Sequence, residues 1–126
     1  MDRTVIRTAA LALVAGLFAS NALAAGDATN GKALFVRCVV CHKTAKDAGN
    51  GVGPNLFGVS GRMAGSVPGF AYSPAMKTAG FAWTDEKLKA YVMNPKQTVP
   101  GDRMPFNGIP NATQAADVVA YLDTLK

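Results

Sequence analysis

The stretch Cys38-Val39-Val40-Cys41-His42 holds both cysteines and the only histidine of this 126-residue chain. A disulfide between thiols this close would form a very small loop and stabilise the fold only weakly. A structural zinc ion needs four ligands, so carboxylates would have to complete the set. A thioredoxin-like pair needs a strand–loop–helix setting, whereas a Gly-rich irregular segment follows here. None of these three interpretations explains why two thiols and an imidazole occur together at this spacing.

The same five residues match C-x-x-C-H, the attachment signature of c-type haem. Two residues between the cysteines let both sulfurs reach the two vinyl groups of one haem from a single helical turn. The next residue is then placed at the iron, where its imidazole can supply an axial nitrogen. The sequence therefore predicts one haem c, attached through Cys38 and Cys41 and ligated by His42.

The ligand on the other face of the iron decides what such a site can do. An open position would suit gas binding or peroxide chemistry, whereas a methionine sulfur closes the iron and favours a high-potential electron carrier. Met63 follows the haem segment too closely to cross to the far face, and Met93 lies on a predicted helix. Met104 lies 62 residues after His42, in a segment stiffened by two prolines. It is the favoured ligand, with Met76 as a rival.

Four short helical stretches are expected, each introduced by a residue that can cap a helix. The capping residues are Asp27, Ser73, Thr84 and Asn111, and the stretches are 28–37, 73–80, 84–94 and a last one beginning at 111. The third should end near Asn94 because Pro95 follows. Ala115, Val118, Val119, Leu122 and Leu125 should form the buried stripe of the last helix.

Two long irregular segments separate these helices. Residues 43–69 contain seven glycines and two prolines, and residues 99–110 contain three prolines and two glycines. Loops of this length are uncommon in a compact domain unless something organises them. A large bound cofactor would do so, because the loops could wrap it and its apolar face would complete the core.

The first 24 residues have the features of a secretory signal peptide. Arg3 and Arg7 form a basic n-region, residues 9–19 are mostly apolar, and Ala22-Leu23-Ala24 is a small-x-small cleavage signal. The alternative is an uncleaved membrane anchor, because the uncharged run 8–26 approaches the roughly 20 residues that span a bilayer. Cleavage would leave residues 25–126 as one small domain outside the cytosol.

The charge of the chain argues against nucleic-acid binding. The net charge is +5, of which residues 1–24 contribute +1, so the remainder carries +4. The basic residues are spread along the sequence without the clusters typical of nucleic-acid-binding proteins. A modest positive field could still steer the protein toward an acidic partner.

Several further segments between residues 31 and 122 match those of a known protein family in both identity and spacing. They are Gly53-Pro54-Asn55-Leu56, Gly69-Phe70-Ala71-Tyr72, Trp83, Tyr91, Asn94-Pro95-Lys96, Pro100-Gly101 through Met104, and Tyr121-Leu122. Together with the haem motif, they make the chain similar to class I cytochrome c, in particular to its cytochrome c2 and mitochondrial branch. The resemblance implies an all-α domain, with short helices and long loops wrapped around one haem.

The resemblance also implies roles for individual residues. Met104 would be the second axial ligand of the iron, and the carbonyl of Pro54 would accept a hydrogen bond from His42. Tyr91 would contact the Met104 sulfur. The residues expected near a haem propionate are Tyr72 and Trp83, as hydrogen-bond donors, and Arg62, as a compensating charge.

Three residues depart from the pattern of the mitochondrial relatives. Asp102 stands where a Thr usually bonds a propionate, and an ionised acid there cannot repeat that contact. Met76 replaces a usual Asn, and Arg103 replaces a Lys. The basic rim around the haem edge is only partly matched, so binding of partners by charge should be weaker than in those relatives.

The function implied is that of a soluble, monomeric, periplasmic carrier of single electrons, not an enzyme, without a small-molecule substrate. Its implied partners are membrane complexes: a quinol-oxidising cytochrome complex as donor, and a terminal oxidase or photosynthetic reaction centre as acceptor.

Overall fold

The structure is a computed structural model that describes residues 26–126. The predicted signal peptide lies outside the described residues. The elements are α1 (Ala28–Leu34), the 3-10 helix η1 (Phe35–Arg37), α2 (Pro74–Lys77), α3 (Asp85–Met93), α4 (Pro95–Thr98) and α5 (Ala112–Asp123). Within this part of the chain, the only β-structure is an isolated bridge between Met63 and Ala82. None of its helices is long and apolar enough to cross a bilayer. The predicted all-α class is confirmed.

All four predicted capping residues begin helices. The side chain of Asp27 accepts hydrogen bonds from the backbone N–H groups of Thr29 and Asn30, at 2.8 and 3.0 Å. Ser73, Thr84 and Asn111 each accept one bond from the N–H three residues later, at 3.0–3.2 Å. These bonds satisfy N–H groups that have no partner inside the helix.

The prediction of four helices misses α4. The third helix does end before Pro95, but the chain resumes a helical turn there instead of a loop. Asn94 caps this turn by accepting a bond from the Gln97 N–H at 3.2 Å. Proline suits the first helical position because its missing N–H would have no partner there. The Pro that stops α3 therefore starts α4.

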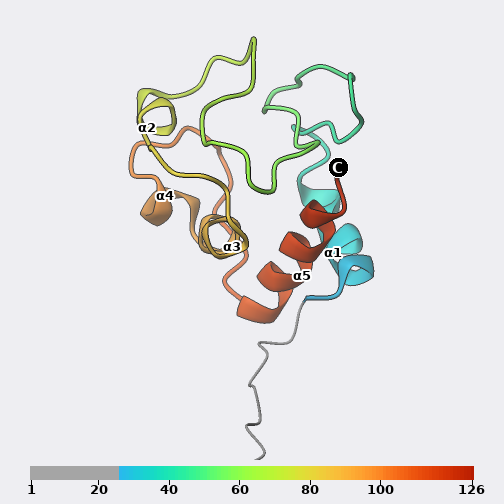
Figure 1. The fold of residues 1–126 in the computed structure, drawn as a ribbon. Coiled ribbons are helices and arrows are strands. Elements are labelled where there is room, and N and C mark those ends of the chain that lie inside the picture. Colours follow the sequence, from blue (N-terminus) through green and yellow to red (C-terminus); the bar gives the residue numbers. More distant parts are fainter. Residues whose placement is uncertain (1–25) are drawn as a thin grey trace, which may run out of the picture.

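The molecule is built on the crossing of α1 over α5, at one side of the fold (Figure 1). A Cβ atom at Gly31 would overlap the carbonyl of Asp117, so only glycine allows this close approach. Asp117 also accepts a bond from the backbone N–H of Asp27 at 2.8 Å. Beside the crossing, the rings of Phe35 and Tyr121 pack with centroids 5.1 Å apart.

The helices and loops enclose a core that opens into a cavity. Four of the five residues in the predicted stripe of α5 are buried, and Leu125 is half-buried. α3 packs on α5, and residues 43–70 form loops at the top of the view in Figure 1. Residues of this core and of the loops line a cavity between them.

Candidate haem-binding site

One cavity of about 400 Å³ collects every site residue predicted from the sequence. This volume is in the range of ligand pockets, and the walls are largely apolar. The predicted residues that line it are Cys38, Cys41, His42, Pro54, Arg62, Tyr72, Trp83, Tyr91 and Met104. Among the other methionines of residues 26–126, only Met76 lines it, and Met63 is half exposed at the surface.

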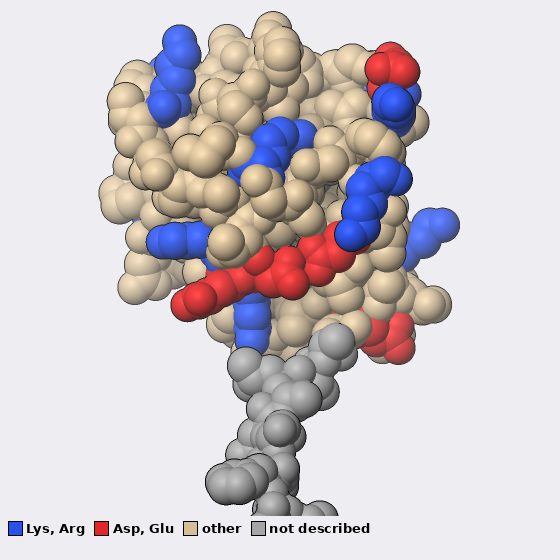
Figure 2. Space-filling view, viewed as in Figure 1, with Lys and Arg blue, Asp and Glu red and all other residues tan. Residues whose placement is uncertain are grey.

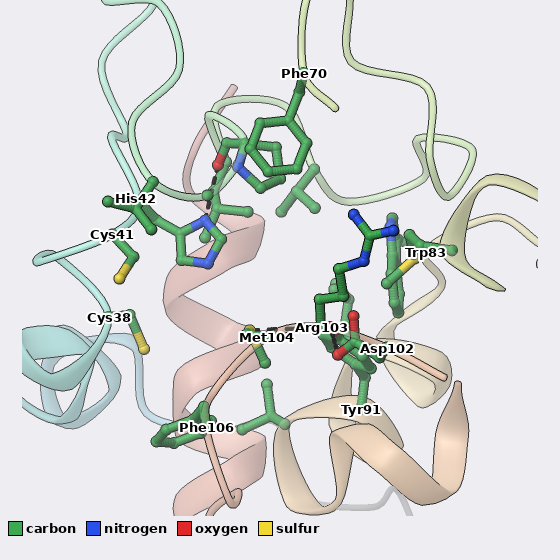
Figure 3. A pocket seen from close by; sticks show the side chains of 18 of the residues that line it. Cys38, Cys41, His42, Phe70, Trp83, Tyr91, Asp102, Arg103, Met104 and Phe106 are labelled. Carbon is green, nitrogen blue, oxygen red and sulfur yellow. Dashed lines mark hydrogen bonds between the residues drawn. The ribbon is translucent and has the colours of Figure 1, made fainter. Parts of the chain in front are cut away.

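The turn that follows η1 presents both thiols and the imidazole to the cavity (Figure 3). The N–H groups of Cys41 and His42 both bond the Cys38 carbonyl, at 3.1 and 2.9 Å, which closes one tight turn. Both cysteines are free thiols. Burial raises the pKa of the Cys38 thiol. The two sulfurs are thus available for thioether bonds to one ligand.

The His42 ring is held in one tautomer. Its Nδ1 donates to the Pro54 carbonyl at 2.8 Å, which leaves Nε2 with a free lone pair for a metal. Burial lowers the pKa of the imidazole, which favours the neutral form that a metal ligand requires. A Cβ at Gly53 would lie 2.8 Å from Nδ1, so the glycine makes room for the ring.

A tight turn precedes Met104. The N–H of Asp102 bonds the Val99 carbonyl at 2.9 Å, and Gly101 between them has φ +91°. Pro100 at the second position and a glycine with positive φ at the third are the signature of a type II turn. Val99 is buried and anchors the turn.

Backbone bonds also hold the chain after this turn. The N–H of Phe106 bonds the Met104 carbonyl at 2.9 Å, and the N–H of Ile109 bonds the carbonyl of Val92 in α3 at 2.8 Å. Ile109 is among the most deeply buried side chains. The Met104 segment is therefore pinned on both sides.

The Tyr91 hydroxyl lies between the Met104 sulfur and the carboxylate of Asp102. The contact with Asp102 was not predicted from the sequence. The hydroxyl donates to Asp102 Oδ2 at 2.6 Å and lies 3.9 Å from the Met104 sulfur (Figure 3). Burial and the bond to Asp102 raise the pKa of this phenol strongly. Its ring packs on Trp83 with centroids 4.9 Å apart. The Tyr91 contact with Met104 agrees with the prediction, whereas the bond to Asp102 is new.

The polar residues expected near a propionate lie at the cavity wall. Arg62 donates to the carbonyls of Phe57 and Asn55 at 3.0 and 3.1 Å, and burial lowers the pKa of its guanidinium. The Tyr72 hydroxyl accepts from the Val67 N–H at 3.0 Å. A hydroxyl can both accept and donate, so this bond leaves its proton for a ligand.

The arrangement fits haem c. Two free thiols stand one turn apart, a neutral imidazole directs a lone pair inward, and apolar walls surround a cavity of suitable size. The thioether of Met104, from another segment, and the guanidinium of Arg62, at the wall, complete the set of groups that haem c would contact.

Comparison with known proteins identifies the family. The sequence model described as "Cytochrome c" matches residues 28–126. The chain is 44% identical to cytochrome c2 of Rhodoblastus acidophilus, over 81% of this chain and 95% of that protein. It is 48% identical to cytochrome c of Euglena viridis, over 80% of this chain and 99% of that protein.

A solved structure agrees with these matches. Cytochrome cH from Methylobacterium extorquens superposes with a TM-score of 0.74 and 42% identity, over 79% of this chain and 99% of that one. All residues that line the cavity fall within residues 28–126, which the family's sequence model matches. The chain therefore belongs to the cytochrome c family, and is an electron-transport protein that carries haem c on the Cys38–His42 motif.

Proposed function

We propose that this protein carries single electrons between membrane redox complexes, with His42 and Met104 as the two axial ligands of its haem iron. The observation that carries the proposal is that both side chains enter one cavity from different segments of the chain (Figure 3). When bound, haem c supplies a one-electron iron couple. A closed iron favours electron transfer over ligand binding, so the protein would have no enzymatic activity of its own.

The chain's own residues would do three things for this function. The Pro54 carbonyl orients His42 by holding its Nδ1 proton. The turn at Pro100 and Gly101 keeps the weak thioether ligand in place against water. Phe35, Leu88, Val118 and Leu122 give the cavity a dry apolar wall, and low polarity with few solvent contacts is one of the means by which proteins set a haem potential.

The proposed partners are a quinol-oxidising cytochrome complex as donor and a terminal oxidase or photosynthetic reaction centre as acceptor. Support comes from the relatives named cytochrome c2 and from the net positive charge. On the face shown in Figure 2, basic side chains are scattered around a band of acidic ones. Arg37 and Arg103 line the cavity. Steering by charge would therefore be local and modest.

We further propose that the carrier is a monomer in the bacterial periplasm, released by cleavage of residues 1–24. Support comes from the basic, apolar and small-x-small pattern of that segment and from the bacterial cytochrome c2 relatives.

The Met104→Ala variant tests the axial ligation. In the wild-type protein we expect sharp low-spin bands on reduction and a weak near-infrared sulfur-to-iron band on oxidation. The variant should lose the sulfur band and lower the midpoint potential, because a thioether ligand favours the ferrous state. Met63→Ala, at a half-exposed methionine outside the cavity, is the matched control. A high-spin wild-type spectrum without the sulfur band would overturn the carrier assignment in favour of ligand binding or catalysis.

A further inference from the structure

The hydroxyl of Tyr91 has two neighbours but only one proton. Asp102 Oδ2 lies 2.6 Å from the phenol oxygen, and the Met104 sulfur lies 3.9 Å from it. A separation of 2.5–2.7 Å is typical of a hydroxyl donating to a carboxylate, which is a charge-assisted bond. A thioether is a weak acceptor. The Tyr91 hydroxyl therefore donates its hydrogen bond to Asp102. The phenol oxygen faces the Met104 sulfur without donating to it.

The backbone holds Asp102 where its carboxylate can accept this hydrogen bond. Its own N–H closes the turn on the Val99 carbonyl at 2.9 Å, two residues before Met104. Tyr91 is held by α3 and by its packing on Trp83. Donor and acceptor thus come from two rigid elements, and both line the cavity. The two elements thus bring the phenol and the carboxylate within hydrogen-bonding distance of each other.

We propose that Asp102 is a positioning residue for the Met104 ligand: its carboxylate binds the Tyr91 proton and places a negative charge beside the iron site. This inference rests on the proposed ligation by Met104. It has two consequences. The sulfur keeps its full electron density because no proton is donated to it, and the charge of Asp102 favours the ferric state. Both effects lower the midpoint potential.

Asp102→Asn separates charge from shape. An Asn of the same size can still accept from Tyr91 through its amide oxygen, but it carries no charge. We expect a positive shift of the midpoint potential, of about tenfold in the redox equilibrium constant, or about 59 mV for one electron. The sulfur-to-iron band should remain. In the reduced holoprotein, the proton NMR signal of the Tyr91 hydroxyl, assigned by its absence in Tyr91→Phe, should move upfield as the bond weakens.

Asp47→Asn is the matched control. It makes the same change of charge at an exposed loop residue outside the cavity, and Asn tolerates the positive φ of 62° found there. It should leave both the potential and the Tyr91 signal unchanged. A merely structural role for Asp102 would change stability without moving that signal.

The outcomes separate this inference from the proposed function. If the wild-type protein lacks the sulfur band, the Met104 ligation fails and the inference falls with it. If the band is present but Asp102→Asn behaves like Asp47→Asn, only the inference is overturned. If Asp102→Asn fails to take up haem, Asp102→Thr repeats the comparison with another neutral acceptor, and an unchanged potential there overturns the inference.

Discussion

The two sides of the cavity hold the proposed iron ligands in different ways. On the His42 side, a ring that is a strong metal ligand follows two cysteines suited to covalent attachment, and one bond to Pro54 orients it. On the Met104 side, a weak thioether has no covalent tether, and its segment is pinned by a type II turn and by backbone bonds on both sides. Rigid backbone is concentrated where the proposed ligand is the weaker of the two.

This difference predicts where each side breaks. The His42 side depends on room for one ring, so it should fail through steric overlap. The Met104 side depends on the shape of its backbone, so it should fail through strain. A glycine on each side allows the two expectations to be compared.

The largest effect is expected for Gly53→Ala. Its Cβ would lie 2.8 Å from His42 Nδ1 and 2.9 Å from Nε2, so the ring would have to turn and break its bond to Pro54. We expect a loss of about 3 kcal/mol in the free energy of unfolding, measured by denaturant titration, and a low yield of haem-loaded protein. Val52→Ala, at an exposed side chain next to it, is the control. Wild-type stability in Gly53→Ala would show that the ring is not confined by this glycine.

A smaller effect is expected for Gly101→Ala. An alanine at φ +91° is strained by about 1–2 kcal/mol, and its Cβ would meet that of Ala75 at 3.0 Å. The turn before Met104 should loosen, so the sulfur-to-iron band should weaken while haem attachment remains normal.

Gly69→Ala is the matched control for the Met104 side. Its φ is +76°, and a Cβ there would meet nothing within 4 Å. It should lose similar stability from backbone strain but keep the full sulfur band. If both variants weaken the band equally, the effect is global, and the special role of the turn is refuted.

The sequence predicted local features better than contacts across the chain. Ser73, Thr84 and Asn111 could be recognised as caps because a cap acts on an N–H three residues away. The α4 turn was missed because Pro95 has two meanings, a stop for one helix and a start for another. Haem attachment could be predicted because both thiols and the imidazole lie within five residues.

The rest of the site depends on contacts that no local pattern encodes. Family resemblance, not residue spacing, placed Pro54 at His42 and Tyr91 at Met104. The bond between Tyr91 and Asp102 joins residues eleven positions apart on different elements. It could not be expected from the family pattern, because the usual residue at position 102 is a Thr. The sequence did show that position 102 departs from that pattern, but it did not indicate that Tyr91 would be the partner of Asp102.

The smallest effect concerns the scaffold shared by both sides, where α3 begins beside the end of α5. A hydrogen bond with Asp123, burial and repulsion from Asp123 raise the pKa of Asp85, although Lys126 opposes the shift. Because the folded protein holds this proton more tightly than the unfolded chain, stability falls as pH rises from the ordinary Asp range through the raised pKa.

Asp123→Asn should remove this loss, because it abolishes the repulsion and also takes a negative charge from the C-terminal end of α5. Both carboxylates are solvent-accessible, so screening limits the gain to about 0.5 kcal/mol above that pH window. The gain should shrink below the window, where Asp85 of the native protein is already protonated. Ser60, which donates to Asp123, can still donate to the amide oxygen. Denaturant titrations of both proteins at several pH values measure the difference. A gain that does not change across that pH window would assign the effect to the helix end and not to the pair. Neither result should alter the sulfur band on the Met104 side.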